Sequence, residues 1–420
     1  MKKIKMSFFL ILIIIKAFSQ ENKPFEINLE EALSAGVKNC SLLKMENINL
    51  ENAKLNVASS YNNFAPEMGF KTGLVKYNDD PDVYLKLNFN LFLSVNASSI
   101  FSIYETVIDM KEGKIKQDAA RKQIKNNIKK SYYSLLFLSE QIELTKEYLA
   151  GVEKRFEITK KMFEEGISPK INFMKSQYSR DMVKINLKTM DLNYKKALLE
   201  FTTLIGIKND NGIILKDKLE ITRDESSDFE AILNNKLSEN YELKTILNSI
   251  EKLSNKKNYH IGALTPSLEL YYNYSLGFSQ NVTDNIFSGD NYLSLSVSLP
   301  LDKFLPLSKT QLEIIQTQNK IKGLNEVYKE KYEEIKIRIR NVIEAIERNR
   351  EITTLLKEDI LMSEEILNLS NKLYEVGSKS LYEVESHHKD FVDTKSRYLN
   401  LVYNYKIDVA NLQYILNLEP

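Results

Sequence analysis

The stretch KMFEEGISPKINF, from Lys161 to Phe173, is repeated in outline by KLYEVGSKSLYEV, from Lys372 to Val384. Each stretch places one glycine, Gly166 or Gly377, after a long run of sequence that contains very few glycines or prolines. The two glycines lie 211 residues apart (377 − 166), and the similarity extends on both sides of them. A period of roughly 200 residues is too long for a solenoid repeat. The sequence therefore predicts two copies of one unit, related by pseudo-symmetry.

Most of the chain reads as long helix. From Ala97 to Glu165 there is no proline and there are only two glycines, and from Ser308 to Val376 there is no proline and only one glycine. At 1.5 Å per residue, each stretch would form a helix of about 100 Å, a length typical of coiled coils. A heptad seam supports this interpretation. Its apolar residues are Ile321, Leu324, Tyr328, Tyr332, Ile335, Ile339, Val342 and Ile346.

Shorter helices are expected on both sides of each long one, so that two short helices stacked end to end would match one long helix. The opening helices are predicted at Leu29 to Tyr61 and Phe229 to Tyr259, and the closing helices at about Pro169 to Ile205 and Lys379 to Leu416.

Between the opening helix and the long helix, the hydrophobic period changes from 3.6 to 2 in both copies. This alternation predicts two β-hairpins, at about residues 66–93 and 266–301. A half-buried strand of a soluble protein also alternates. Here, however, the alternation runs for about 10 residues, the length that a tilted strand needs to cross the hydrocarbon core. We therefore expect one face to contact lipid, through Leu85, Leu87, Phe89, Leu91, Leu293, Leu295, Val297 and Leu299.

The residues around these apolar positions fit a membrane strand. The alternating positions carry Lys, Asn and Ser, which suit a water-filled lumen. Tyrosines near the strand ends are expected to form an interfacial girdle; they are Tyr77, Tyr84, Tyr271, Tyr272 and Tyr292.

Four strands cannot seal themselves in a membrane. Unpaired N–H and C=O groups in hydrocarbon each cost several kcal/mol, and a barrel needs about eight strands to close. Two chains would supply eight strands, whose interior side chains would fill, whereas three chains would supply twelve and leave room for a channel. The sequence thus predicts a homotrimeric tube.

The first residues and the composition define the compartment and exclude several classes of function. Residues 1–19 have the basic start, short apolar run and small-residue end of a secretory signal peptide. The net charge is +1 with both signs interleaved, so no nucleic-acid partner is expected. No phosphate-binding loop, nucleophile elbow or metal motif occurs, and we predict no enzyme activity, cofactor or metal site. His387 and His388 are interpreted as helix-surface residues.

The pattern closely resembles the TolC-like outer membrane efflux proteins, also called outer membrane factors. The resemblance covers about Phe25 to Leu418 and is carried by the signal peptide, the repeated order of helix, hairpin, long helix, glycine turn and shorter helix, and the ending Tyr405…Ala410-Asn411-Leu412…Leu416. It implies a mainly α fold with β, in which each chain adds four transmembrane strands to a 12-stranded barrel of a trimer, above a long α-helical barrel.

The family resemblance also implies a function and partners. Such a protein is the outer membrane exit duct of a tripartite efflux or type I secretion system in a Gram-negative cell, extending into the periplasm. It conducts substrates passively from a periplasmic adaptor (membrane fusion protein) and an inner-membrane pump of the RND, ABC or MFS type. The alternative from the residues alone is a secreted periplasmic or surface coiled-coil scaffold or adhesin without a pore.

Individual positions follow from the resemblance. The turns Glu165-Gly166-Ile167 and Val376-Gly377-Ser378 match the helical tips where the adaptor docks, and Tyr374 and Lys379 match a closed-state network. Glu383 matches an acidic position that rings the periplasmic aperture, and three copies would favour cations. The second acidic position falls on Ser386, a departure, beside Glu385. Asn172 is the counterpart of Glu383 in the first repeat.

The expected domain order is therefore a signal peptide (1–19), a first repeat (20–206), a connector that forms a reduced equatorial collar (207–228) and a second repeat (229–420).

Overall fold

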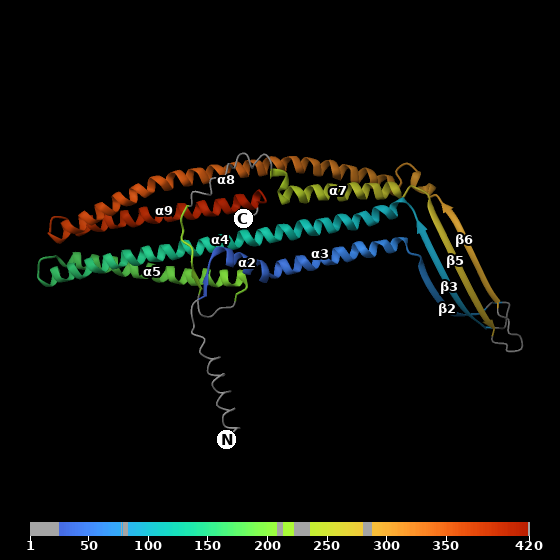
Figure 1. The fold of residues 1–420 in the computed structure, drawn as a ribbon, viewed down its shortest axis with the longest axis horizontal. Coiled ribbons are helices and arrows are strands. Elements are labelled where there is room, and N and C mark those ends of the chain that lie inside the picture. The colour runs from blue at the N-terminus through green and yellow to red at the C-terminus, as the bar shows by residue number, and fades with distance from the viewer. Residues whose placement is uncertain are drawn as a thin grey trace, which may run out of the picture. The chain divides into compact units, whose positions relative to one another are not determined.

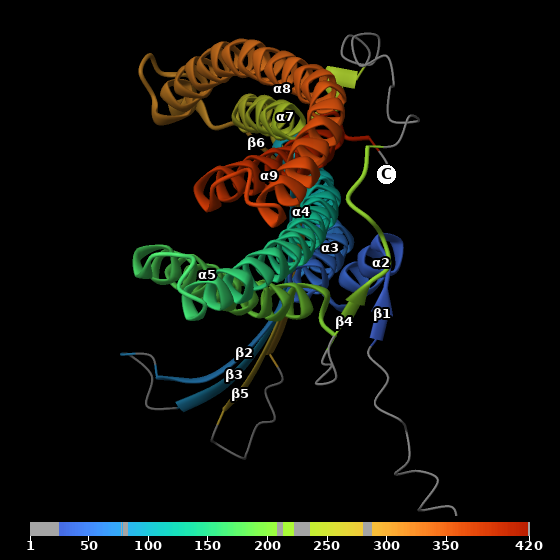
Figure 2. The ribbon, with the colours of Figure 1, turned by 90° about the vertical axis from the view of Figure 1, so that its left-hand side faces the viewer.

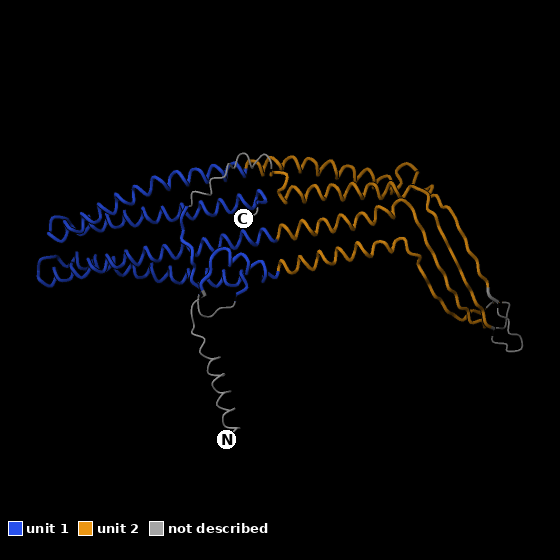
Figure 3. The backbone as a smooth tube through the Cα atoms, viewed as in Figure 1, with its two compact units in different colours: residues 1–41, 121–233, 338–420 blue, residues 42–120, 234–337 orange. Residues whose placement is uncertain are grey.

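The structure, a computed structural model, describes residues 25–76, 78, 83–207, 213–221, 236–279 and 288–418. The expected signal peptide and much of the connector lie outside this range. The chain divides into two compact units (Figure 3), which do not coincide with the two sequence repeats. Unit 1 contains residues 1–41, 121–233 and 338–420, and unit 2 contains residues 42–120 and 234–337.

The four helices around the glycine turns begin and end within two residues of their predicted bounds (Figure 1). Few glycines and no prolines interrupt them, so the backbone hydrogen-bond ladder continues for up to 68 residues. They are α4 (Ala97–Glu164), α5 (Lys170–Ile205), α8 (Lys309–Glu375) and α9 (Leu381–Ile415). Among the described residues, no helix has an apolar stretch long enough to cross a bilayer.

The opening helices differ from the prediction. The first is broken at Cys40, which is extended (ψ 122°). The break lets Asn39 turn to the end of α5, where its side-chain amide donates to the Ile205 carbonyl at 3.1 Å. The second begins later than predicted, after Asn240, whose side chain accepts from two backbone N–H groups; residues 229–235 lie outside the described range. The observed helices are α2 (Leu29–Asn39), α3 (Ser41–Ser60) and α7 (Tyr241–Gly262).

Unit 2 contains both predicted hairpins, joined in one antiparallel sheet of order β2-β3-β5-β6. The central pair joins the two sequence repeats, because β3 of the first pairs with β5 of the second. Within the described residues, β2 and β6 pair on one side only, so the sheet has two open edges. The strands are β2 (Glu67–Lys76), β3 (Val83–Val95), β5 (Ser267–Ser279) and β6 (Ser288–Ser298).

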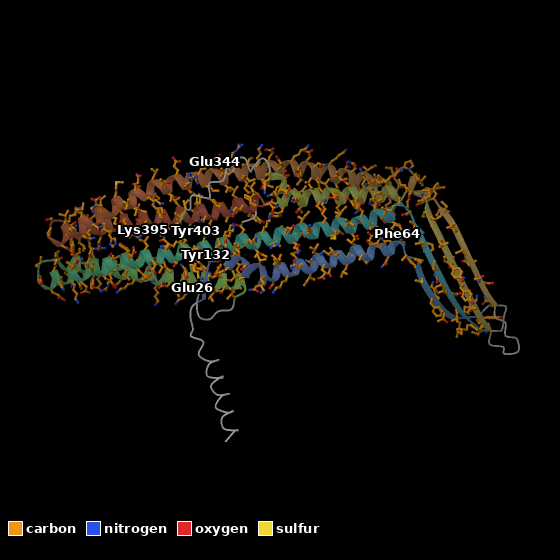
Figure 4. All side chains as sticks on the ribbon, viewed as in Figure 1. Glu26, Phe64, Tyr132, Glu344, Lys395 and Tyr403 are labelled. Carbon is orange, nitrogen blue, oxygen red and sulfur yellow. The ribbon has the colours of Figure 1, made fainter. Side chains whose placement is uncertain are left out.

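The strand β6 ends earlier than predicted. Pro300 lacks a backbone N–H for the ladder, and a 3₁₀ helix follows at Leu301–Phe304. Leu299 therefore lies one residue beyond the strand in which we had placed it. At the same end of the sheet, the 3₁₀ helix Tyr61–Phe64 precedes β2, and Phe64 is marked in Figure 4.

The helices of unit 2 lie in the order α3-α4-α7-α8. Thr106 on α4 bonds Ser60 on α3 at 3.2 Å. On the other side of α4, Asp109 pairs with Lys252 of α7 at 2.6 Å. The α7 helix in turn contacts α8, where the His260 Nδ1 atom lies 3.1 Å from the Glu313 carboxylate. The edge helices of this unit are therefore α3 and α8.

The helices of unit 1 form a corresponding row, α5-α4-α9-α8, which Figure 2 shows from the end. Stacked Phe163 and Phe173 join α4 to α5 with ring centroids 5.3 Å apart. Gln141 on α4 bonds Ser396 on α9 at 3.0 Å, and Asn349 on α8 bonds Asp408 on α9 at 3.2 Å. Thus each unit has two edge helices, and α8 supplies one edge in both.

A small two-stranded sheet anchors the described part of the connector in unit 1. The strands β1 (Phe25–Ile27) and β4 (Ile213–Leu215) pair in parallel (Figure 2). Fully buried Tyr132, labelled in Figure 4, donates from its hydroxyl to Asp217 at 2.7 Å. Burial, strengthened by this bond, raises the pKa of Tyr132 above its usual value, so the phenol stays protonated.

Candidate functional site

The two predicted tips have the same backbone geometry. Gly166 and Gly377 adopt φ of +75° and +76°, a left-handed conformation that favours glycine. In each turn the glycine N–H bonds a carbonyl three residues back at 3.0 Å, and the next N–H bonds one five residues back at 2.8 Å. This pair of hydrogen bonds is the pattern that closes a helix C-terminus. The tight turns predicted from the sequence are therefore present.

The tip side chains are accessible. Ile167 is 69% exposed and Val376 is 73% exposed, and Glu165 and Ser378 are also exposed. No atom of the described chain lies within 4 Å of a Cβ placed on either tip glycine. Each tip thus presents bare backbone beside an apolar side chain, a surface that another protein could approach closely.

The predicted aperture residue Glu383 begins α9 in a capping box. Its carboxylate accepts from the Ser380 N–H at 2.9 Å and from the Ser380 hydroxyl at 2.8 Å. These bonds, supported by the charge of Lys379, lower the pKa of Glu383 below its usual value. The counterpart in the first repeat, Asn172, instead donates from its amide to the Ser168 hydroxyl at 3.3 Å.

The predicted gate tyrosine lies inside the helix bundle. Tyr374 on α8 is 8% exposed, and its hydroxyl is 3.2 Å from the hydroxyl of buried Thr159 on α4. One residue along α8, Glu375 accepts from Lys154 of α4 at 3.0 Å. These two contacts tie α4 to α8 just behind the tips.

A third contact in this region was missed by the sequence analysis, which placed His388 on the surface. His388 is only 6% exposed, and its Nδ1 lies 2.6 Å from the guanidinium of Arg155, which is 4% exposed. Burial, together with the charge of Arg155, lowers the pKa of His388 to about 3. The imidazole is therefore neutral, and Nδ1 accepts the bond from Arg155. We call this pair the Arg155–His388 contact; it joins α4 to α9.

The surroundings of this contact explain the burial of His388. Gly151 leaves space for the ring, because a Cβ there would lie 2.5 Å from the His388 Cε1 atom. The Tyr148 ring packs edge-on against the imidazole at 4.5 Å. The available signal was periodicity, since His388 follows buried Val384 by four residues. Its neighbour His387 is half-buried, with Nδ1 2.6 Å from the Ser370 hydroxyl.

Glu385 does not resemble an exposed aperture carboxylate. It is partly buried, and desolvation raises its pKa despite the opposing charge of Arg155. Glu385 lines an apolar groove of about 930 Å³. The other residues of the groove include Met174, Tyr178 and Met182 of α5, together with Tyr148 of α4 and Tyr382 of α9. In the described part of the chain, no three His, Cys, Asp or Glu side chains are grouped so that they could hold a metal ion.

The register of the sheet collects the predicted lipid-facing residues on one face. Leu91 is paired with Met68 and Tyr272, and Leu295 is paired with Leu270. Residues that are paired in an antiparallel sheet share a face. This face carries two strongly polar side chains, Lys76 at the end of β2 and Asn291 on β6. Its other side chains are Met68, Phe70, Thr72, Leu74, Val83, Leu85, Leu87, Phe89, Leu91, Leu93, Val95, Leu268, Leu270, Tyr272, Tyr274, Leu276, Phe278, Leu293, Leu295 and Val297.

The same register corrects part of the predicted girdle. Tyr84, Tyr271 and Tyr292 belong to the opposite, polar face, because each is an odd number of residues away from an apolar-face residue of its strand. Of the tyrosines predicted for the girdle, only Tyr272 lies on the apolar face, and Tyr77 falls outside the described residues. The sequence placed these tyrosines by their distance from strand ends, which does not determine the face.

Comparison with known proteins identifies structures that share this fold. No protein family model matches the chain, and no curated protein sequence matches it. Solved structures do match. A CusC structure concerned with transmembrane channel formation has a TM-score of 0.81 at 13% identity, covering 94% of this chain and 93% of that chain.

Two further structures agree. The outer membrane protein VceC of Vibrio cholerae has a TM-score of 0.77 at 13% identity, covering 92% of this chain and 95% of its own. The Campylobacter jejuni CmeC outer membrane channel has a TM-score of 0.76 at 16% identity, covering 96% of this chain and 86% of its own. The chain therefore has the fold of these outer membrane channels, as the sequence resemblance predicted.

Proposed function

We propose that this protein is an outer membrane exit duct that works as a homotrimer. The four-stranded sheet carries the proposal: one face is mostly apolar, the other is mostly polar, and both edges are open within the described residues. An open edge in hydrocarbon costs several kcal/mol per unpaired group. Copies that pair β2 of one subunit with β6 of the next would remove that cost. Three copies of four strands would give a twelve-stranded barrel, wide enough for a channel.

The edge helices of unit 1 support subunit association independently. On α5, exposed apolar residues recur every seven positions at Ile171, Tyr178, Ile185, Leu192 and Leu199, each at least 59% exposed. On the other edge, α8 and the turn after it repeat this at Leu355, Met362, Leu369 and Val376. A seven-residue apolar repeat is the seam of a coiled coil. These two edge stripes, which a single chain leaves uncovered, would cover each other between copies.

The remaining assignments follow from this duct and from the fold of its relatives. The duct would be located in the outer membrane of a Gram-negative cell and extend into the periplasm. The glycine tips would dock a periplasmic adaptor, and an inner-membrane pump would supply the energy, so the chain itself would conduct passively. Tyr374, Lys379 and Glu383 would belong to the periplasmic aperture, and the Arg155–His388 contact would hold it closed. The scaffold or adhesin alternative provides no reason for an apolar sheet face.

The test compares neighbouring residues on opposite sheet faces. Leu295→Asp puts a charge on the apolar face, whereas Ser294→Asp puts the same charge on the polar face of the same strand. Each full-length variant would be purified in detergent, sized by light scattering and reconstituted in planar bilayers. We expect trimers and ion channels from the wild type and from Ser294→Asp, and neither from Leu295→Asp. A monomeric wild type that stays in solution without detergent would refute the duct.

A further inference from the structure

Two aromatic rings pack against a third, that of Tyr271, on the polar face of the sheet. Phe92 of β3 is paired with Tyr271 of β5, and their ring centroids are 6.4 Å apart in an edge-on arrangement. Tyr292 of β6 lies diagonally to Tyr271, with centroids 5.5 Å apart. Tyr292 is 53% exposed, so much of its ring surface is open. The cluster spans three strands at the end of the sheet where the chain enters from α7 and leaves to α4.

Acidic side chains flank this cluster. Glu67 of β2 is paired with Phe92, so it extends the row of rings to the open edge of the sheet. Glu269 lies one row closer to the helices, paired with Ser94 and Ser296. In the three rows of the polar face that contain Glu269, Tyr271 and Asn273, these two glutamates are the only charged side chains. Their other members are Ser94, Ser296, Phe92, Tyr271, Ser294, Gly69, Asn90, Asn273 and Tyr292.

The two lysines of this face lie farther from the helices. Lys71 is paired with Asn88, and Lys86 is paired with Gly73, in the next two rows. Asp290 of β6 is paired with Ser275 and lies in the same row as Lys71. The polar face therefore has an aromatic and acidic zone near the helices, and a zone farther away that carries both lysines and one carboxylate. This division is not needed for strand pairing, because the backbone ladder is continuous through both zones.

We propose that Phe92, Tyr271, Tyr292, Glu67 and Glu269 form a binding collar for aromatic or lipophilic organic cations. Ring faces attract cations, and the attraction grows where water is excluded; carboxylates add charge attraction without a lysine to offset it. The inference rests on the proposed function, since only a closed barrel turns the polar face into a lumen. Three subunits would then place the collar where the helical conduit opens into the barrel.

The ordinary role of such a cluster is to stabilise the sheet through cross-strand aromatic pairs. That role predicts effects on folding but none on which ion passes. The collar predicts that a cation with a large flat ring system lingers in the channel and blocks the potassium current. It also predicts that a flat anion of similar size does not. The two roles are therefore separated by the charge of the blocker.

The experiment measures block of single-channel potassium current by rhodamine 6G, a flat cation, and by fluorescein, a flat anion. Wild-type trimers are compared with Glu67→Gln/Glu269→Gln, which keeps shape, and with Phe92→Leu/Tyr271→Leu, which removes two rings. The control is Tyr272→Leu, one residue along β5 on the apolar face. We expect rhodamine 6G to block the wild type and the control equally, and each collar variant about tenfold more weakly. Fluorescein should not block.

The collar would be wrong if rhodamine 6G blocked both collar variants within twofold of the wild type, or if fluorescein blocked as strongly as rhodamine 6G. Trimer size and unblocked conductance, measured on the same samples, show whether the variants have folded. The glutamine variant tests the collar even if removal of the rings disturbs the sheet. Failure of the wild type to form any channel would instead refute the duct, and the collar with it.

Discussion

Replacing Gly151 with alanine should destabilise the protein, although the same change usually stabilises a helix. In a helix interior, alanine is favoured over glycine by about 1 kcal/mol. At Gly151, however, the new Cβ would lie 2.5 Å from the His388 Cε1 atom. The ring cannot swing away freely, because it is buried and packed against Tyr148. It would have to leave Arg155, and a hydrogen bond to a charged group contributes about 1.5–3 kcal/mol. The net change is a loss of about 0.5–2 kcal/mol.

The measurement is thermal unfolding of the purified protein in detergent, followed by circular dichroism at constant protein concentration. Gly323→Ala in α8 is the matched control, because no atom of the described chain lies within 4 Å of its Cβ position. We expect this control to raise the midpoint and Gly151→Ala to lower it. In the double variant Gly151→Ala/His388→Ala the clash is absent, so the two changes should be strongly non-additive. A Gly151→Ala protein as stable as the Gly323→Ala protein would refute the role assigned to this contact.

Three further predictions concern the tips. Tyr374→Phe removes the hydroxyl that contacts Thr159, so it should raise the fraction of time that the channel is open in planar bilayers. Thr159→Val should raise this fraction equally. The double variant should raise it little further than either single variant. Glu383→Gln should weaken the cation preference, measured as the reversal potential in a KCl gradient. The wild type should keep this preference at pH 4.5, which equals the ordinary pKa of a glutamate side chain. The hydrogen bonds from Ser380 lower the pKa of Glu383, so its carboxylate is still mostly ionised at this pH. Gly377→Pro cannot adopt φ +76°, and should stop efflux in a dependent strain without preventing trimer formation.

Long-range regularities of the sequence predicted the fold well. The absence of breakers located α4 and α8, because a helix continues until the ladder is interrupted. Period-2 alternation located the four strands, because each strand has one apolar and one polar face. These signals extend over tens of residues, so an error at one position changes little. Local events were harder: the break at Cys40 depends on how Asn39 meets the end of α5, which no pattern in the opening helix indicates.

The candidate site was predictable in its backbone but not in its side-chain contacts. A glycine between two helices indicates a left-handed turn, and both turns are present. The partner of a side chain depends on which helices become neighbours. His388 was misplaced because histidine is intermediate in burial preference, and Gly151, which makes room for it, lies 237 residues earlier (388 − 151). The family resemblance assigned Tyr374 to a closed-state network, but it indicated neither the burial of this side chain nor Thr159 as its partner.

The division of the chain into units bears on how copies would assemble. In unit 2 the open strands are β2, from the first repeat, and β6, from the second. In unit 1 the edge helices with exposed stripes are α5, again from the first repeat, and α8, from the second. Two different edges that cover each other produce a head-to-tail contact, which ends in a closed ring or continues as a filament. A filament would leave terminal strands open in lipid, where each unpaired backbone group is costly. On the duct proposal, closure is therefore enforced by the membrane at the sheet, and the helical stripes need only be compatible with it. Substitutions of the α5 stripe should weaken the trimer in detergent more than in a bilayer, where the barrel still closes the ring.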